Sequence, residues 1–305
     1  MIVHRWNHLF AACALLALTA AGCSGLSRVL ISNEQELEIG AGVDLQIEAE
    51  YRILDDADPV AVWARQLVGH MVPHSARFRD PAQVNNYSVK VIYDNSLVNA
   101  FAAPGGYTYI ATGLVLEAAT CAEIAGVMGH ELAHVTQRHG VKRLTGAAVT
   151  LGLTSAVLSG GLTQDVIVGI YGFLMNTTFS RKDETEADEV GVQIMHASGY
   201  NPYALADFFR TLARMSSGRV PTFLSSHPDS GDRAEAIESI IRQRWSGLTR
   251  NSTSHQFTCQ GTRMQLPEIK QRLQAGNVQV RPGTGTGTAD PSTVPARIQA
   301  GRARR

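Results

Sequence analysis

The chain has 305 residues, a length that suits one large domain or two modest ones at about 150 residues per domain. Hydrophobic residues make up 44% of it and charged residues 18%, which excludes a disordered chain and leaves enough apolar material for a core. The 27 basic and 27 acidic residues cancel, so no overall positive charge points to nucleic acid, and four cysteines are too few for a small disulfide-stapled scaffold.

Residues 1–22 are predicted to be a signal peptide. Arg5 precedes an uncharged stretch, residues 9–22, that is shorter than the roughly 20 apolar residues of a spanning helix and has the order of a secretory signal. The stretch leads into Leu18-Thr19-Ala20-Ala21-Gly22-Cys23, which resembles the bacterial lipobox. At a lipobox, lipoprotein signal peptidase cleaves before a cysteine whose sulfur carries diacylglycerol.

The lipobox resemblance favours a lipid anchor on Cys23. Ala20 stands where leucine is more usual, and ordinary cleavage after an Ala-x-Ala sequence is the alternative. Ser24 follows the cysteine where an aspartate would signal retention in the inner membrane. We therefore expect an outer-membrane lipoprotein that faces the periplasm of a Gram-negative bacterium. Its attachment would be stable, because lipoproteins carry several acyl chains and each buried methylene contributes about 0.8 kcal/mol.

The first part of the mature chain is predicted to combine helix with a small sheet. Apolar residues at helical intervals predict helix over residues 33–70. Alternating β-branched and aromatic residues predict a strand over 86–94, and short strands follow at 98–103 and 107–111. Pro104-Gly105-Gly106 between the last two is typical of a turn, so we expect these two strands to be antiparallel neighbours.

The second part is predicted to be helical. Thr120 and Glu123 form a capping box and Gly140 suits a helix end, which together bound one long helix. Residues 144–175 are apolar and small, and we expect two buried or lid-like helices there, with contact to a membrane surface as the alternative. Further helices are predicted at 181–197, 202–216 and 232–245.

The tail, residues 276–305, is expected to be disordered, because it is rich in glycine and threonine and carries five arginines against one aspartate. This leaves residues 23–275 as one domain. No repeat of 20–50 residues is evident, which argues against an appended solenoid.

The pattern H-E-x-x-H lies midway along the capped helix, as His130-Glu131-Leu132-Ala133-His134. A spacing of four places both imidazoles on one face, one turn apart, where they can share a tetrahedral metal ion. Glu131 points about 100° away from His130 and can reach a metal-bound water without binding the ion. We therefore predict a metal site rather than two unrelated helical histidines and a surface glutamate.

A third ligand should leave one position open for water. The extension found in metzincins is absent, because position 137 is glutamine and position 140 is glycine. His139, five residues past His134, is expected at the surface near the C-terminus of the helix, where the helix dipole favours it.

The third ligand is predicted downstream, in residues 180–188. Glu184 and Asp188 are one turn apart on a helix and can face the same point. Glu184 would complete a His/His/Glu site, and Asp188 would accept the outer N–H of a ligand histidine and fix its tautomer. Glu186 faces away from Glu184 and is expected to be solvated.

Several stretches together resemble the gluzincin metallopeptidase family of HtpX, the Ste-type CAAX prenyl proteases and the periplasmic lipoprotein peptidases. The similarity runs from about Ile31 to Arg244. The stretches that carry it are Ile31-Ser32-x-x-x-Glu36-x-x-x-Gly40, Asn99-Ala100-Phe101-Ala102-Ala103-Pro104-Gly105-Gly106, the H-E-x-x-H pattern, Ser180-Arg181-x-x-Glu184-x-Glu186-Ala187-Asp188, Ser198-Gly199-Tyr200-Asn201-Pro202, and Ser226-His227-Pro228 with Arg233. The tetratricopeptide domain of the larger β-barrel assembly-enhancing relatives has no counterpart, so the chain is similar to the compact lipoprotein members.

The resemblance implies a mostly α-helical α+β zincin fold with a small antiparallel sheet, and one zinc ion on His130, His134 and Glu184. It implies Glu131 as the general base. Arg233 would orient the substrate and Glu184.

The resemblance also gives His227 a role, and three alternatives stay open. As a cation near the zinc, His227 could hold the oxyanion of the tetrahedral intermediate. As a fourth zinc ligand it could keep the enzyme latent, and otherwise it only caps the helix after Pro228.

Phe101, Ala102 and Ala103 are predicted to bind substrate. An exposed edge strand beside the metal can pair with any extended peptide through main-chain hydrogen bonds, which favours unfolded segments. The alternative is an internal strand with Phe101 in the core.

Cys121 and Cys259 could pair in an oxidising periplasm and tie residues 250–275 to the core.

The predicted function is zinc-dependent endopeptidase activity on unfolded or misassembled envelope proteins. The strongest rival is a non-proteolytic lipoprotein that keeps the zinc as structure and acts as a scaffold or chaperone. Glu131 argues against that rival, because it binds no metal and has no structural duty at such a site. An exopeptidase would need an acidic pocket for the free amine of its substrate, and no motif for such a pocket appears. A serine hydrolase and a nucleotide-binding protein are not supported either, because the sequence has neither a G-x-S-x-G motif nor a P-loop.

Overall fold

The computed structural model describes residues 31–84, 87–150, 162–215, 221–227, 233–252 and 259–284. The predicted signal peptide, Cys23, the break at Gly160-Gly161 and the tail beyond residue 284 lie outside these residues. Of the described helices, none is both long enough and apolar enough to cross a membrane.

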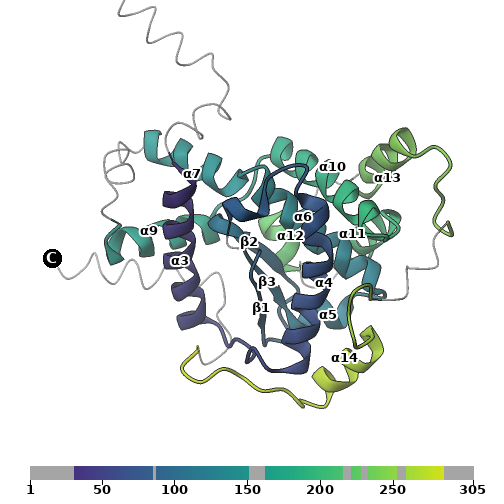
Figure 1. Cartoon of the computed structure of the whole chain (residues 1–305), viewed down its shortest axis with the longest axis horizontal. Coiled ribbons are helices and arrows are strands. Elements are labelled where there is room, and N and C mark those ends of the chain that lie inside the picture. Colours follow the sequence, from purple (N-terminus) through teal and green to yellow (C-terminus); the bar gives the residue numbers. More distant parts are fainter. Residues whose placement is uncertain are drawn as a thin grey trace, which may run out of the picture.

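The described chain is mostly helical, with one small sheet (Figure 1). The strands are β1 (Val89–Ile92), β2 (Ala100–Ala103) and β3 (Tyr107–Ala111). The helices are α3 (Asn33–Glu50), α4 (Pro59–Ser75), α5 (Thr112–Glu117), α6 (Cys121–Thr136), α7 (His139–Thr150), α9 (Gln164–Asn176), α10 (Arg181–Ala197), α11 (Tyr203–Met215), α12 (Thr222–Ser226), α13 (Arg233–Arg244) and α14 (Leu266–Gln274). This confirms the predicted α+β class.

The helix predicted over residues 33–70 is two helices, α3 and α4. Between them, Ile53 forms a β-bridge with Ile92, so this short segment adds to the sheet. Asp58 then starts α4, because its side chain accepts the backbone N–H of Val60 at 2.8 Å and Pro59 suits the first helical position. Two local signals therefore restart the helix after the extended segment.

The helices predicted at 181–197, 202–216 and 232–245 are confirmed as α10, α11 and α13. At α10, Ser180 and Asp183 form a reciprocal capping box that sets where the helix begins. The apolar region 144–175 contributes to two helices, α7 and α9, which pack against each other. The first of them begins earlier than predicted, at His139.

The prediction of a single helix that continues to Gly140 is wrong. Helix α6 ends at Thr136, and Arg138 takes a left-handed backbone conformation with φ 57°. The Arg138 side chain holds this turn, because its Nε donates to Glu36 Oε2 at 2.8 Å and its Nη2 to the carbonyl of Ile31 at 2.7 Å. The chain then enters α7 in a new direction, with Gly140 inside that helix.

The sheet has the order β1-β3-β2 and is mixed, whereas an antiparallel sheet was predicted. Strands β2 and β3 pair antiparallel across the Pro104–Gly106 turn, as expected, with Ala100 opposite Ile110. Strands β1 and β3 pair parallel, with Val89 opposite Thr108. Strand β3 lies in the centre of the sheet and buries four of its five residues, and β2 lies at the edge. Of the two alternatives for β2, the structure therefore shows an edge strand.

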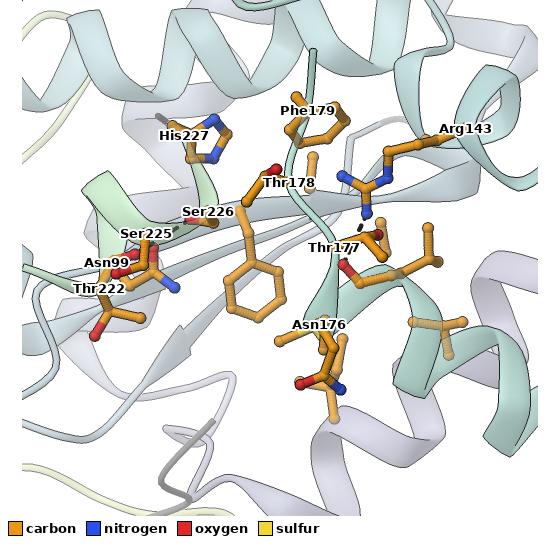
Figure 2. A pocket seen from close by; sticks show the side chains of 18 residues that line it. Asn99, Arg143, Asn176, Thr177, Thr178, Phe179, Thr222, Ser225, Ser226 and His227 are labelled. Carbon is orange, nitrogen blue, oxygen red and sulfur yellow. Dashed lines mark hydrogen bonds between the residues drawn. The ribbon is translucent and has the colours of Figure 1, made fainter. Parts of the chain in front are cut away.

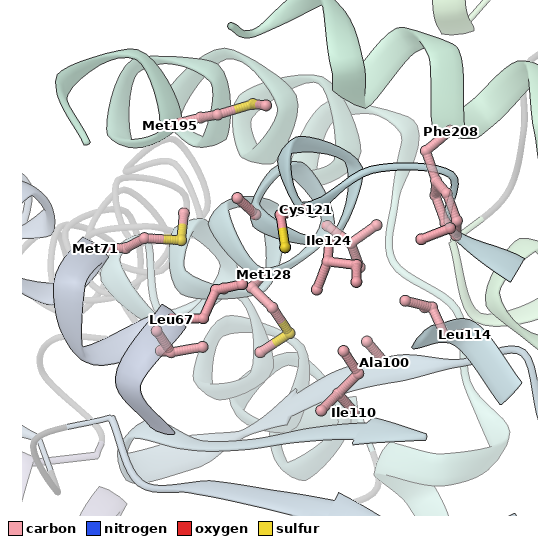
Figure 3. Close-up of a cluster of buried hydrophobic side chains, with 14 of the residues drawn as sticks. Leu67, Met71, Ala100, Ile110, Leu114, Cys121, Ile124, Met128, Met195 and Phe208 are labelled. Carbon is pink, nitrogen blue, oxygen red and sulfur yellow. The ribbon is translucent and has the colours of Figure 1, made fainter. Parts of the chain in front are cut away.

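The two faces of the sheet are covered by different helices. Tyr109 and Ala111 face a core shared with α3, α7 and α9, while Ile110 faces the larger core of α4, α6 and α11. In that larger core, Ile124 and Met128 of α6 lie among Leu67, Met71 and Phe208 (Figure 3). Helix α6 is buried along its whole length, so the H-E-x-x-H pattern sits at the centre of the molecule.

The C-terminal segment returns to the N-terminal part of the domain. Cys121 and Cys259 form a disulfide with a Cα–Cα distance of 5.1 Å. Beyond α14, the N–H of Gln279 donates to Asp58 Oδ2 at 2.7 Å and that of Arg281 to the carbonyl of Ile53 at 2.8 Å. Residues 276–284 are therefore part of the fold, and the domain boundary predicted at residue 276 is too early.

Candidate active site

Helix α6 brings His130 and His134 together at the centre of the site. Both side chains are buried, and their Nε2 atoms lie 2.9 Å apart. The distance follows from the four-residue spacing, which places the two imidazoles on one helix face. Two neutral imidazoles with converging nitrogens form half of a typical tetrahedral zinc site.

Helix α10 supplies the third predicted ligand. Glu184 is buried, and its carboxylate oxygens lie 3.4 Å from His130 Nε2 and 3.5 Å from His134 Nε2. This contact depends on a close crossing of α6 and α10. A Cβ added to Gly191 would lie 3.0 Å from His130 Cα, so only glycine permits this approach without a shift of the helices.

His227, at the end of α12, lies against the same three side chains. Its Nδ1 is 3.0 Å from Glu184 Oε1 and 3.3 Å from His130 Nε2. Phe223 packs its ring on the imidazole, with 4.6 Å between centroids. The side chain of His227 therefore points into the metal-ligand cluster, and only its backbone N–H takes part in capping α12.

Glu131 is fully buried beside this cluster, and neither of its carboxylate oxygens has a hydrogen-bond partner among the described residues. The nearest ring nitrogen is His227 Nε2, 3.4 Å from Oε1. Burial raises the pKa of Glu131, although the nearby His227 and His130 lower it in part. A buried carboxylate that accepts no hydrogen bond is costly, so Glu131 is a candidate for a functional residue.

Asp188 and Arg233 support the ligands from behind. Asp188 Oδ1 lies 2.9 Å from His130 Nδ1, where it accepts the outer N–H of that imidazole. Arg233 donates to both oxygens of Asp188 at 2.8 Å and lies 2.6 Å from Glu184 Oε2, with its guanidinium over the ring of Phe209. Arg233 therefore orients two carboxylates at once.

These contacts shift the protonation of the ligands. Burial and Arg233 lower the pKa of His130, but its bonds to Asp188 and Glu184 outweigh both and raise the pKa to about 9. Burial would raise the pKa of Glu184, but His227 and the bonds to His130 and His134 hold it well below its usual range. The site thus keeps Glu184 ionised.

The residues fit a divalent metal ion. His130, His134, Glu184 and His227 each offer one ligand atom, and these four atoms lie within 4.8 Å of one another in a buried site. Imidazole nitrogen with carboxylate oxygen is a donor set that suits zinc. A shared metal ion would account for the close approach of the two Nε2 atoms to each other and to Glu184.

Two residues at this site were not predicted. His139 was expected at the surface but is 1% exposed, and its Nδ1 lies 2.8 Å from His134 Nδ1. The turn at Arg138 brings His139 to this position. The sequence around Arg138 gives no sign of the turn and is compatible with a helix that continues through it. Phe179 stacks on His134 with 3.9 Å between ring centroids, and its only sequence signal is its place directly before the helix cap at Ser180.

Glu186, expected to be solvated, is half-exposed and lies 3.3 Å from His139 Nε2. Glu186 therefore contacts the site indirectly, through His139. The prediction for Glu186 failed for the same reason as the prediction for His139, because the turn at Arg138 brings His139 within reach of Glu186.

A pocket of about 380 Å³ opens beside His227. Figure 2 shows Arg143 and Phe179 on one side of it and Ser226 and His227 on another. Phe101, Ala102 and Ala103 of the edge strand β2 also line it, so the predicted substrate strand, the pocket and the metal-ligand cluster are contiguous. No acidic side chain is among the described residues that line the pocket.

A buried H-E-x-x-H helix with a glutamate from a second helix is the arrangement of a gluzincin metallopeptidase site. The profile described as Peptidase family M48 matches residues 61–241, and the chain belongs to this family.

Three relatives from Escherichia coli (strain K12) illustrate the similarity. The chain is 33% identical to Metalloprotease LoiP over 50% of its own length and 61% of LoiP. It is 30% identical to Metalloprotease YcaL over 51% of its length and 62% of YcaL. It is 27% identical to Beta-barrel assembly-enhancing protease over 70% of its length and 46% of that protein. The matches thus span less than two thirds of the length of each of these relatives.

Proposed function

We propose that the chain is a zinc-dependent endopeptidase that hydrolyses peptide bonds in unfolded or misassembled proteins of the cell envelope. The observation that carries the proposal is the buried carboxylate of Glu131, which accepts no hydrogen bond from the described residues, next to His130, His134 and Glu184. The names of the relatives, two metalloproteases and a β-barrel assembly-enhancing protease, agree with it.

In the proposed mechanism, His130, His134 and Glu184 would hold a zinc ion. A zinc ion there would lower the pKa of a bound water towards about 7 and polarise the scissile carbonyl. Glu131 would accept a proton from the attacking water at its carboxylate and later return it to the leaving amine. Burial raises the pKa of Glu131 above that of an ordinary glutamate, which is the direction that favours accepting and returning a proton. Arg233 and Asp188 keep Glu184 and His130 in place.

The edge strand β2 supports the choice of unfolded substrates. Phe101 and Ala102 are only partly buried, and within the described sheet β2 pairs with β3 on one side alone. An extended peptide can add to the other side through main-chain hydrogen bonds, and the neighbouring pocket can take one of its side chains. The neutral and basic lining also disfavours an exopeptidase, which needs an acid for the free amine of its substrate.

We further propose that a lipid on Cys23 anchors the enzyme in the outer membrane, facing the periplasm. The disulfide between Cys121 and Cys259 suits such an oxidising compartment. If a Cys23→Ala chain stayed membrane-bound through a high-salt wash, this part of the proposal would be wrong.

The decisive experiment is digestion of reduced and alkylated lysozyme by the chain that starts at Ser24, beside Glu131→Gln. We expect zinc-dependent cleavage by the first and a loss of about 10²–10⁴-fold in the second, with equal zinc content in both. Native lysozyme is the control for the preference for unfolded chains. Two inert proteins that both hold zinc would favour the scaffold or chaperone alternative, unless His227→Ala restores cleavage.

A further inference from the structure

His139 is a buried histidine that the proposed mechanism does not use. Its Nδ1 lies 2.8 Å from Nδ1 of His134, the nitrogen of that ligand that faces away from the metal-ligand cluster. On its other side, His139 Nε2 lies 3.3 Å from Glu186 Oε2 and 3.7 Å from Asp183 Oδ1. The described structure thus contains a chain of contacts from a predicted metal ligand to two partly exposed carboxylates.

The hydrogen-bond directions along this chain are fixed by the metal site. His134 can offer a lone pair at Nε2 only if its proton is on Nδ1. That N–H must then donate to Nδ1 of His139, whose own proton is therefore on Nε2. The Nε2–H of His139 in turn donates to Glu186, so each of the three groups has one definite role.

We propose that His139 is a positioning residue that fixes the tautomer and ring orientation of His134 for metal binding. The inference rests on the proposed zinc site but goes beyond it, by giving the second ligand histidine its own orienting group. Asp188 does this for His130, with Arg233 behind it. His139 does it for His134, with Glu186 and Asp183 behind it.

The fold holds His139 in this place by a device separate from the site. His139 follows Arg138, whose left-handed φ of 57° turns the chain back toward His134. Such a conformation is costly for a residue with a side chain and persists only where the surroundings hold it. Here the buried Glu36 accepts bonds from both Arg138 and Arg79, at 2.8 Å and 2.9 Å to Oε2.

A second metal ion on His139, Asp183 and Glu186 is the competing explanation, since their ligand atoms also lie close together. Lys142 argues against it, because its Nζ lies 3.8 Å from Glu186 Oε2 and adds positive charge there. His139 Nε2 also lies within hydrogen-bonding distance of Glu186 Oε2, so a hydrogen bond explains their contact without a metal ion. The number of zinc ions bound per chain separates the two explanations.

The experiment measures zinc affinity by competition with a chromophoric chelator for wild type, His139→Leu and His139→Asn. Leucine removes the acceptor, and we expect a loss of about 10–100-fold in affinity, typical for the orienting partner of a ligand histidine. Asparagine keeps an oxygen acceptor and should restore most of the affinity. Glu189→Gln, on the exposed face of α10, is the matched control and should bind zinc like wild type.

A second measurement does not depend on variants. The ¹⁵N spectrum of the histidine rings in the zinc-loaded wild type should show His134 protonated on Nδ1 and His139 on Nε2. A His139 protonated on Nδ1, two zinc ions per chain, or unchanged zinc affinity in His139→Leu would each overturn the role of His139. A wild type that binds no zinc would overturn the proposed function as well, so the two failures are distinguishable.

Discussion

His227 places its two ring nitrogens on different partners, Nδ1 at 3.0 Å from Glu184 and Nε2 at 3.4 Å from Glu131. It therefore lies between a predicted metal ligand and the proposed general base. A substrate carbonyl and an attacking water need this same space. The geometry favours the latent form among the three alternatives for His227, because a residue that only caps the helix after Pro228 would not turn its ring toward Glu184 and Glu131.

His227→Ala is accordingly expected to raise endopeptidase activity toward an unfolded protein. A closed form favoured by about 1.4 kcal/mol would correspond to a rise of about tenfold. Initial rates of peptide-bond cleavage at saturating zinc measure it, with His196→Ala as a control histidine outside the site. A fall in activity would instead assign His227 to stabilisation of the oxyanion.

His130 makes metal binding depend on pH. With its pKa raised to about 9, its imidazole carries an extra proton at neutral pH in the metal-free protein. Zinc must displace that proton, so affinity should fall by about tenfold for each pH unit below 9. Chelator competition at pH 6, 7 and 8 tests this, and the same affinity at all three values would contradict it.

Among the elements, the crossing of α6 and α10 sets the distance between the histidines and Glu184. Gly191 faces the backbone of His130 at the point of closest approach. Gly191→Ala would push the helices apart, with a cost of about 1–3 kcal/mol in the free energy of unfolding and a lower zinc affinity. Urea unfolding and chelator competition measure the two effects.

The matched control for this substitution is Gly146→Ala in α7, where an added Cβ meets no atom within 4 Å. Alanine there should stabilise the helix by about 0.5–1 kcal/mol and leave zinc affinity unchanged. If Gly191→Ala behaved like Gly146→Ala, the close crossing would not be what positions Glu184.

The elements also show which features the sequence alone could predict. The start of α10 was predictable, because the capping box of Ser180 and Asp183 is local. The proximity of His130 and His134 was predictable too, since a spacing of four places both on one helix face. The place of His139 was not predictable, because the turn before it depends on Glu36, which lies 102 residues from Arg138. The parallel pairing of β1 with β3 likewise depends on strand order, which no local pattern encodes.

At the scale of the whole molecule, the C-terminal segment closes the domain. Leu266, Ile269 and Leu273 of α14 are buried in the larger core, and Val280 forms a β-bridge with Leu54. The disulfide links residues 138 positions apart, and the chain between them includes every residue of the metal-ligand cluster. Its closure therefore restrains the unfolded form of the entire catalytic region.

The double variant Cys121→Ala/Cys259→Ala should lower the free energy of unfolding by about 2–5 kcal/mol. Wild type kept reduced during urea unfolding is the control, because it lacks the bond but keeps both side chains in the core. Cys121 begins α6 more than two turns before His130, so zinc affinity of the folded double variant should match that of wild type. An unchanged urea midpoint would show that packing of α14 alone closes the domain, whereas a loss of zinc affinity would show that the bond also fixes α6.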